Sequence, residues 1–264
     1  MWADIGAGQG AFTLALADLL GPGASVIAVD RDRGALGENA RLVRSAFPAT
    51  QLTTHVADSQ QQFEMFARAR FEMFDWLKKN GRDNSDCGLG SPVQQLQHAG
   101  LPGENFLAVH ANYLAETDFD LLAKSKTSVV HCPRSHAYFR HQKFPLEKLL
   151  AKKINVCLGT DSLATVAKNG KEKLELNLFR EMQTLARTNP QLPSETILQM
   201  ATANGARALG LAGKTGELSE NAFADLISIP FAGKISNAAA AVNFSSPVSA
   251  AMIDGKWEIA PEFL

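Results

Sequence analysis

The stretches NFLAVHANYL (105–114), TSVVHCPRS (127–135) and INVCLGTDS (154–162) decide the expected fold. Each contains a short apolar, partly β-branched run that is typical of a buried strand, and each run ends in polar residues. Helical patterns follow these three stretches, at 117–125, 145–153 and 174–188. Strands that alternate with helices at this spacing predict a parallel sheet with crossover helices, and hence an α/β fold.

Five ionisable residues stand out because they fall where these strands and the preceding one, QLTTHVAD (51–58), should end. The carboxyl ends of parallel strands meet at one edge, so these side chains are expected to lie together. Imidazole and carboxylate groups are ligands that zinc or ferrous iron accepts, and such an ion makes hydroxide from bound water near neutral pH. The candidate residues are His55 and Asp58, His110, His131, and Asp161.

Each of these residues also has a plain structural interpretation. A single histidine at a strand end is more often a hydrogen-bonded structural residue than a ligand, and Asp161 could cap the helix that follows it. Their occurrence on successive strand ends favours a site. The remaining histidines fall on helices or loops and are expected at the surface: His98, His136 and His141.

The composition is that of an ordinary globular protein. Of the 264 residues, 45% are hydrophobic and 20% are charged, with a formal net charge of −1. Such a balance gives no indication of nucleic acid or a membrane as a partner, whereas oligomerisation stays possible. Three cysteines without metal-ligand spacing favour a reducing cytoplasm. No signal peptide or membrane span is predicted.

A glycine-rich turn opens the chain. The segment DIGAGQG (4–10) follows a short apolar run, a helical pattern comes next, and the strand ASVIAVD (24–30) ends in Asp30. Glycines at a strand-to-helix turn let the backbone approach a nucleotide, and an acid about twenty residues later can bind ribose hydroxyls. The pattern predicts a Rossmann-like βαβ fragment with a weak cofactor site formed by Asp4, Gly6, Gly8, Gly10 and Asp30.

This opening resembles the first motif of class I S-adenosylmethionine-dependent methyltransferases. The resemblance covers only some 45 to 58 residues, and no later element of that family follows. It implies half of a site for S-adenosylmethionine, which is not expected to bind tightly.

The rest of the chain resembles the amidohydrolase superfamily, in its branch of deaminases and chlorohydrolases, which includes guanine and aminodeoxyfutalosine deaminases. The resemblance spans about residues 50–264, in order. The motifs that carry it are HVADSQQQFEMF (55–66), VHANYL (109–114), VVHCPRSHAYF (129–139), LGTDSLAT (158–165), ATANGARALGL (201–211) and GELSENAFADLI (216–227).

That resemblance implies a partial (βα)8 TIM-type barrel, about strands 5–8 with a small terminal β-sheet. It also implies a metal-dependent hydrolase acting on the C–N bond, or on a C–Cl bond, of an aromatic compound such as an aminopurine. It implies that His55 and Asp161 bind a divalent metal, zinc or iron. Asp58 would shuttle protons, His110 would polarise the attacking water or stabilise the intermediate, and His131 would line the substrate pocket. Asp161 would also accept the proton of that water.

Two departures from the family pattern weaken this expectation. No His-x-His pair occurs anywhere in the chain, although the family uses one to hold its metal. Asp58 is also one methylene shorter than the family's glutamate, and a proton donor needs close hydrogen-bond reach. We therefore expect little activity from this chain alone.

The two resemblances divide the chain into a fragment at 1–50 and an amidohydrolase part at 51–264, joined somewhere within 47–62. Three hypotheses follow: a deaminase-type hydrolase or its remnant, a methyltransferase fragment, or a fusion product without either activity. Bound metal would favour the first, binding of S-adenosylmethionine the second, and neither the third.

Overall fold

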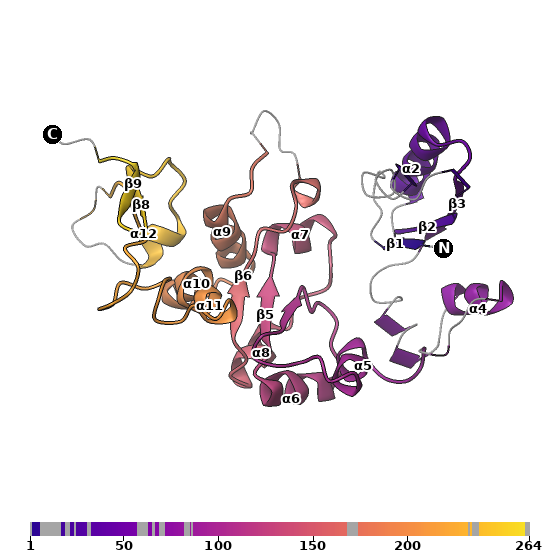
Figure 1. Cartoon of the computed structure of the whole chain (residues 1–264), viewed down its shortest axis with the longest axis horizontal. Coiled ribbons are helices and arrows are strands. Elements are labelled where there is room, and N and C mark those ends of the chain that lie inside the picture. The colour runs from indigo at the N-terminus through magenta and orange to yellow at the C-terminus, as the bar shows by residue number, and fades with distance from the viewer. Residues whose placement is uncertain are drawn as a thin grey trace. The chain divides into compact units, whose positions relative to one another are not determined.

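The computed structural model describes residues 2–5, 17–18, 22–23, 25–30, 33–56, 63–64, 67–68, 72–81, 85, 87–167, 174–231, 233 and 238–261. The chain forms two compact units, residues 1–98 and residues 99–264. The described strands form three sheets of three strands each, in the orders β1-β2-β3, β4-β5-β6 and β7-β8-β9 (Figure 1). The first two sheets are parallel, so the predicted α/β class is confirmed.

The first unit contains a β-α-β arrangement formed by β2, α2 and β3, whereas the helix predicted to follow the glycine-rich turn lies outside the described residues apart from residues 17–18. The strands of this unit are β1 (Trp2–Ile5), β2 (Ser25–Asp30) and β3 (Gln51–Val56), and α2 (Arg33–Ala46) connects β2 to β3. Val43 of α2 is fully buried and Ala40 nearly so, which gives this helix an apolar face to bury. The part of this unit that the structure describes also includes the helices α4 (Glu72–Lys79) and α5 (Pro92–His98).

The position of β3 differs from the expectation of one parallel array running from about residue 50 to 165. All six residues of β3 pair with β2, with His55 opposite Val29 and Val56 opposite Asp30. The strand therefore extends the amino-terminal sheet, whereas β4 belongs to another sheet in the second unit. The expected boundary between residues 50 and 51 stays a prediction.

The second unit is built on the sheet β4-β5-β6, with β5 in the centre (Figure 1). Helix α6 joins β4 to β5, and α7 and α8 join β5 to β6, so the predicted alternation of strands and helices is confirmed here. The bounds are β4 (Leu107–Val109), α6 (Glu116–Ser125), β5 (Ser128–His131), α7 (Pro133–Tyr138), α8 (Leu146–Ala151) and β6 (Val156–Leu158).

Apolar side chains from this sheet and its helices form the core of the second unit. Val129 of β5 and Val156 of β6 are fully buried, as is Leu149 of α8. Three helices follow β6, and α10 and α11 contact that strand (Figure 1). They are α9 (Leu178–Thr188), α10 (Ser194–Ala201) and α11 (Ala203–Ala208), preceded by the short 3-10 helix η1 (Leu163–Thr165).

The predicted small terminal sheet is also present. Strands β7 (Leu226–Ser228), β8 (Ala250–Ile253) and β9 (Lys256–Ile259) pair antiparallel, and α12 (Ala238–Val242) lies between β7 and β8 in the chain. Among the residues described, no helix combines the length and apolar character that crossing a membrane requires.

Two asparagines tie α11 to the beginning of β6. The side chain of Asn204 donates to the Val156 carbonyl at 2.9 Å. Val156 lies on β6, which pairs only with β5 among the described strands, so this carbonyl needs a partner from outside the sheet. Asn155 donates in turn to the Asn204 carbonyl at 3.0 Å and to the Ser128 hydroxyl at 2.9 Å. These bonds satisfy polar groups that would otherwise be buried without partners.

Replacing Asn204 with alanine should therefore destabilise the second unit. The buried Val156 carbonyl would lose its partner, at a cost of roughly 1–3 kcal/mol in the free energy of unfolding. Denaturant unfolding of Asn204→Ala measures this loss. Asn243→Ala is the matched control, because Asn243 bonds only within its own exposed turn. Equal losses in the two variants would contradict the assignment.

Candidate functional site

Three of the predicted site residues lie at the carboxyl ends of neighbouring strands in the second unit. His110 follows β4 directly, His131 is the last residue of β5, and Asp161 comes three residues after β6. Backbone bonds keep these ends in register, since His110 N–H donates to the Val130 carbonyl at 2.8 Å and Gly159 N–H to the His131 carbonyl at 2.9 Å. The structure thus brings the three residues to one edge of the sheet, where parallel βα folds place ligands.

The turn after β6 determines how Asp161 is presented. A Cβ atom at Gly159 would lie 2.8 Å from Val130 Cγ1 and 3.3 Å from Cys132 Sγ, so only glycine lets the chain pass so close to β5. Asp161 itself has a φ of 55°, in the left-handed region that aspartate and asparagine tolerate better than most residues.

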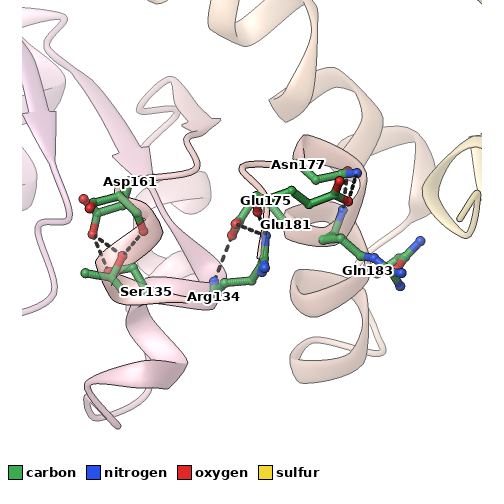
Figure 2. Close-up of polar contacts among 10 residues, drawn as sticks. Arg134, Ser135, Asp161, Glu175, Asn177, Glu181 and Gln183 are labelled. Carbon is green, nitrogen blue, oxygen red and sulfur yellow. Dashed lines mark hydrogen bonds and ion pairs between the residues drawn. The ribbon is translucent and has the colours of Figure 1, made fainter. Parts of the chain in front are cut away.

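Two hydroxyl groups hold the carboxylate of Asp161. Ser135 Oγ donates to Asp161 Oδ2 at 2.6 Å, and Thr165 Oγ1 donates to the same oxygen at 3.0 Å. Figure 2 shows Ser135, at the start of α7, facing Asp161. Both bonds use Oδ2, so the other carboxylate oxygen of this exposed residue is left for a ligand or a proton.

A buried carboxylate, Glu181 on α9, fixes the start of α7. Glu181 Oε2 accepts a hydrogen bond from the Arg134 backbone N–H at 2.8 Å, and Oε1 lies 3.7 Å from Arg134 Nη1 (Figure 2). Arg134 precedes Ser135, so this contact also positions the hydroxyl that reaches Asp161. Glu181 was not predicted as a site residue. Its sequence signal is a charge on the apolar stripe formed by Leu178, Met182 and Leu185.

Burial raises the pKa of Glu181 to about 7, because desolvation disfavours the charged form more than the contacts with Arg134 favour it. The side chain has no exposed surface, and Oε1 makes no hydrogen bond with any described residue. The carboxyl group is therefore partly protonated near neutral pH.

Histidines form an aromatic cluster beside this edge. The His131 ring stacks on Phe144 with centroids 3.8 Å apart and meets His136 edge-on at 5.3 Å. His136 in turn lies 5.4 Å from His141, whose Nδ1 is 3.2 Å from the Tyr113 hydroxyl. His136 and His141 were expected at the surface, but both are partly buried, because His136 packs against His131 and His141 packs against His136.

The buried members of this cluster are held neutral. Burial lowers the pKa of His131 to about 3, with the neighbouring His136 and His110 as smaller causes. Burial likewise lowers the pKa of His136. A neutral imidazole can donate from one nitrogen and accept at the other.

The described residues do not make a complete metal site. Among them, no group of three or more His, Cys, Asp or Glu side chains converges as a metal would require. Burial raises the pKa of Cys132 to about 12 and that of Cys157 to about 11, so these thiols are protonated and poor ligands. Asp161, His110 and His131 share one edge but do not converge as the three protein ligands that a catalytic zinc site usually has.

The other predicted site residues belong to the first unit. Asp4 lies in β1, Asp30 ends β2, and His55 is the fifth residue of β3. The side chains of these three residues lie outside what the structure describes, as do all atoms of Gly6, Gly8, Gly10 and Asp58.

Comparison with known proteins assigns most of the chain to one group. A model of the amidohydrolase family matches residues 73–257. The match begins after His55 and Asp58, so it lends no support to the roles expected for those two residues. It includes His110, His131 and Asp161.

Among curated relatives, a 5-methylthioadenosine/S-adenosylhomocysteine deaminase of Syntrophobacter fumaroxidans is 41% identical over 147 residues, which cover 53% of this chain and 32% of that protein. The chain thus spans about a third of the length of this relative.

Two solved structures are similar in fold. Aminofutalosine deaminase of Helicobacter pylori has a TM-score of 0.59 at 17% identity, over 97% of this chain and 65% of its own. A zinc-bound adenosine deaminase of Xanthomonas campestris has a TM-score of 0.58 at 22% identity, over 89% of this chain and 51% of its own. At such identities the likeness concerns the fold alone.

The raised pKa of Glu181 predicts a pH dependence of stability. Between its ordinary pKa of 4.5 and the folded value of about 7, the folded state binds more protons than the unfolded state, so stability falls as pH rises. Above pH 7 the full cost is roughly 3 kcal/mol.

Glu181→Gln keeps an oxygen that can accept from Arg134 N–H and removes the titration. The free energy of unfolding of this variant, minus that of the unchanged protein, should therefore rise between pH 5 and pH 8. Denaturant unfolding at several pH values measures the difference, which also cancels the opposite titration of His131. A difference that stays constant over this range would refute the shift.

Proposed function

Because the chain belongs to the amidohydrolase family, we propose that it contributes the carboxyl-terminal part of a hydrolytic deaminase that acts on an aminopurine nucleoside. The main observation that supports the proposal is that His110, His131 and Asp161 lie at one edge of the β4-β5-β6 sheet. The name of the 41% identical relative supports an aminopurine substrate over the chlorinated alternative.

In the proposed reaction water replaces the exocyclic amine, which leaves as ammonia. Asp161 accepts the proton of the attacking water, and the hydroxyls of Ser135 and Thr165 hold its carboxylate in place for that purpose. His110 polarises the water or stabilises the intermediate. His131, neutral and stacked on Phe144, contributes to the wall of the substrate pocket.

A divalent metal, zinc or iron, is part of this proposal, and the zinc in the Xanthomonas relative supports it. Asp161 is the described residue that we assign as a ligand, with His55 as a second ligand and Asp58 as the proton shuttle by resemblance only. Because the described residues do not complete a site, we expect the chain alone to hold metal weakly.

For the amino-terminal part, proposed as residues 1–50, the alternative hypothesis is a fragment of a methyltransferase. The parallel sheet with Asp4 in β1 and Asp30 at the end of β2 is compatible with that ancestry. The proteins found by comparison give S-adenosylmethionine binding no support. A fusion product without either activity is the third hypothesis, and the two experiments below separate all three.

The first experiment measures metal binding and turnover on the folded, monodisperse chain. Zinc affinity, measured by competition with a chelator, should be weak and should depend on Asp161. Asp161→Asn keeps the left-handed turn but removes the charge, so it should abolish the residual affinity while leaving the unfolding midpoint nearly unchanged. Ammonia release from 5-methylthioadenosine should be slow or absent.

Stoichiometric zinc or iron together with rapid ammonia release would show that a second chain, or ligands beyond those assigned, completes the site. Zinc affinity that Asp161→Asn leaves unchanged would remove Asp161 from the proposed site altogether.

The second experiment is a calorimetric titration with S-adenosylmethionine. We expect binding that is weak or absent, because a glycine turn and two acids supply only part of an adenosine and methionine pocket. Tight binding with one equivalent of ligand would instead promote the methyltransferase hypothesis. Binding of neither zinc nor S-adenosylmethionine would favour the fusion product.

A further inference from the structure

A cavity of about 780 Å³ lies between α7 and α9, apart from the edge that carries His110, His131 and Asp161, none of which is among the described residues that line it. The two helices contact one another directly (Figure 1). The described lining of the cavity includes four arginines and a single carboxylate, that of Glu175. The arginines are Arg134, Arg140, Arg180 and Arg187.

The spacing of two of these arginines makes the cavity wall basic along its length. Arg180 and Arg187 are seven residues apart on α9, with Gln183 between them, so all three lie on one face of the helix. Glu181, which opposes the charge of Arg134, is buried on another face of α9. Positive charge therefore exceeds negative charge along this described wall.

Hydrogen bonds hold two of the guanidinium groups in place before any ligand binds. Arg134 Nη1 donates to the Glu175 carbonyl at 3.0 Å, and Arg180 Nη1 donates to Gln183 Oε1 at 3.3 Å. Gln183 is itself anchored, because its Nε2 donates to the Phe244 carbonyl at 2.6 Å. Figure 2 shows Arg134, Glu175 and Gln183 in this region. Each bond occupies one arm of a guanidinium group and leaves further N–H donors.

Arg187 differs from these two, since it makes no hydrogen bond or ion pair with any residue that the structure describes. A group of guanidinium donors with few acidic partners is suited to phosphate oxygens, which accept two parallel N–H bonds from one arginine. The volume exceeds that of a lone phosphate and lies in the range of pockets for small organic ligands. Tyr138, 40% exposed, adds an aromatic ring on which a base can stack.

From this arrangement we propose that the cavity between α7 and α9 is a binding site for a phosphate-bearing small molecule, separate from the proposed deaminase edge. The guanidinium groups of Arg180 and Arg187 bind the phosphate oxygens, together with Arg134. The ring of Tyr138 contacts the organic part of the ligand.

Calorimetric titration of the full chain, in a buffer free of phosphate and metal, tests this site without any need for turnover. The probes are adenosine diphosphate, inorganic pyrophosphate and adenosine. The variant is the double substitution Arg180→Gln with Arg187→Gln. The control is Lys124→Gln with Lys214→Gln, which changes the net charge equally at exposed positions outside the described lining.

We expect adenosine diphosphate to bind one equivalent per chain, with a Kd that rises about tenfold or more in the arginine variant and stays nearly unchanged in the lysine control. Weaker binding of pyrophosphate than of adenosine diphosphate would support an organic phosphate as the ligand. Equal binding of the two would support a site for phosphate groups alone.

Three results would overturn the proposal. One is that neither phosphate compound binds. Another is that the lysine control loses as much affinity as the arginine variant, because the effect would then be one of net charge. The third is that adenosine binds as tightly as its diphosphate and the arginine variant does not affect it, which would place the ligand elsewhere in the chain.

Discussion

The arrangement at the carboxyl edge of the second sheet depends on the buried carboxylate of Glu181. Its bond to the Arg134 backbone holds the beginning of α7 against α9, and the next residue, Ser135, reaches across to Asp161 after β6. Three segments that are distant in the sequence are thereby linked through two hydrogen bonds. Burying a carboxylate is costly, and the raised pKa of Glu181 reflects that cost. The cost is offset by a backbone donor and by the guanidinium group of Arg134.

Strand periodicity was sufficient to predict much of the second unit. The apolar runs ending at His110, His131 and before Asp161 predicted neighbouring parallel strands with these residues at one edge, and β4, β5 and β6 have that arrangement. The small terminal sheet was expected from the family resemblance, and β7, β8 and β9 form it, whereas their antiparallel direction was not predicted. The partner of β3 was not predicted either, because a β-branched run shows that a strand forms but not which strand it pairs with. The pairing of β3 with β2 along all six residues is determined by tertiary packing.

Patterns within single elements did not predict the residues that helices and turns contribute to this edge of the sheet. His136 and His141 look like surface residues in the sequence, but in the structure His136 packs against His131 and Phe144, and His141 packs against His136. In the sequence Glu181 resembles the other charged residues of an amphipathic helix, but in the structure it lies on the face of α9 that packs against the core. Such residues acquire a role only through packing between elements, and the spacing of residues within one element carries no information about that packing.

The left-handed backbone at Asp161 has an evolutionary consequence. Asparagine and glycine are the residues that adopt this conformation at little cost, so the changes that leave the turn intact also remove the carboxylate. If Asp161 has the role proposed for it, a descendant lineage could pass from enzyme to inert scaffold by one substitution that selection for stability would not detect. Under that proposal, retention of the fold in a homologue is no guide to its catalysis, whereas the identity of this one side chain is.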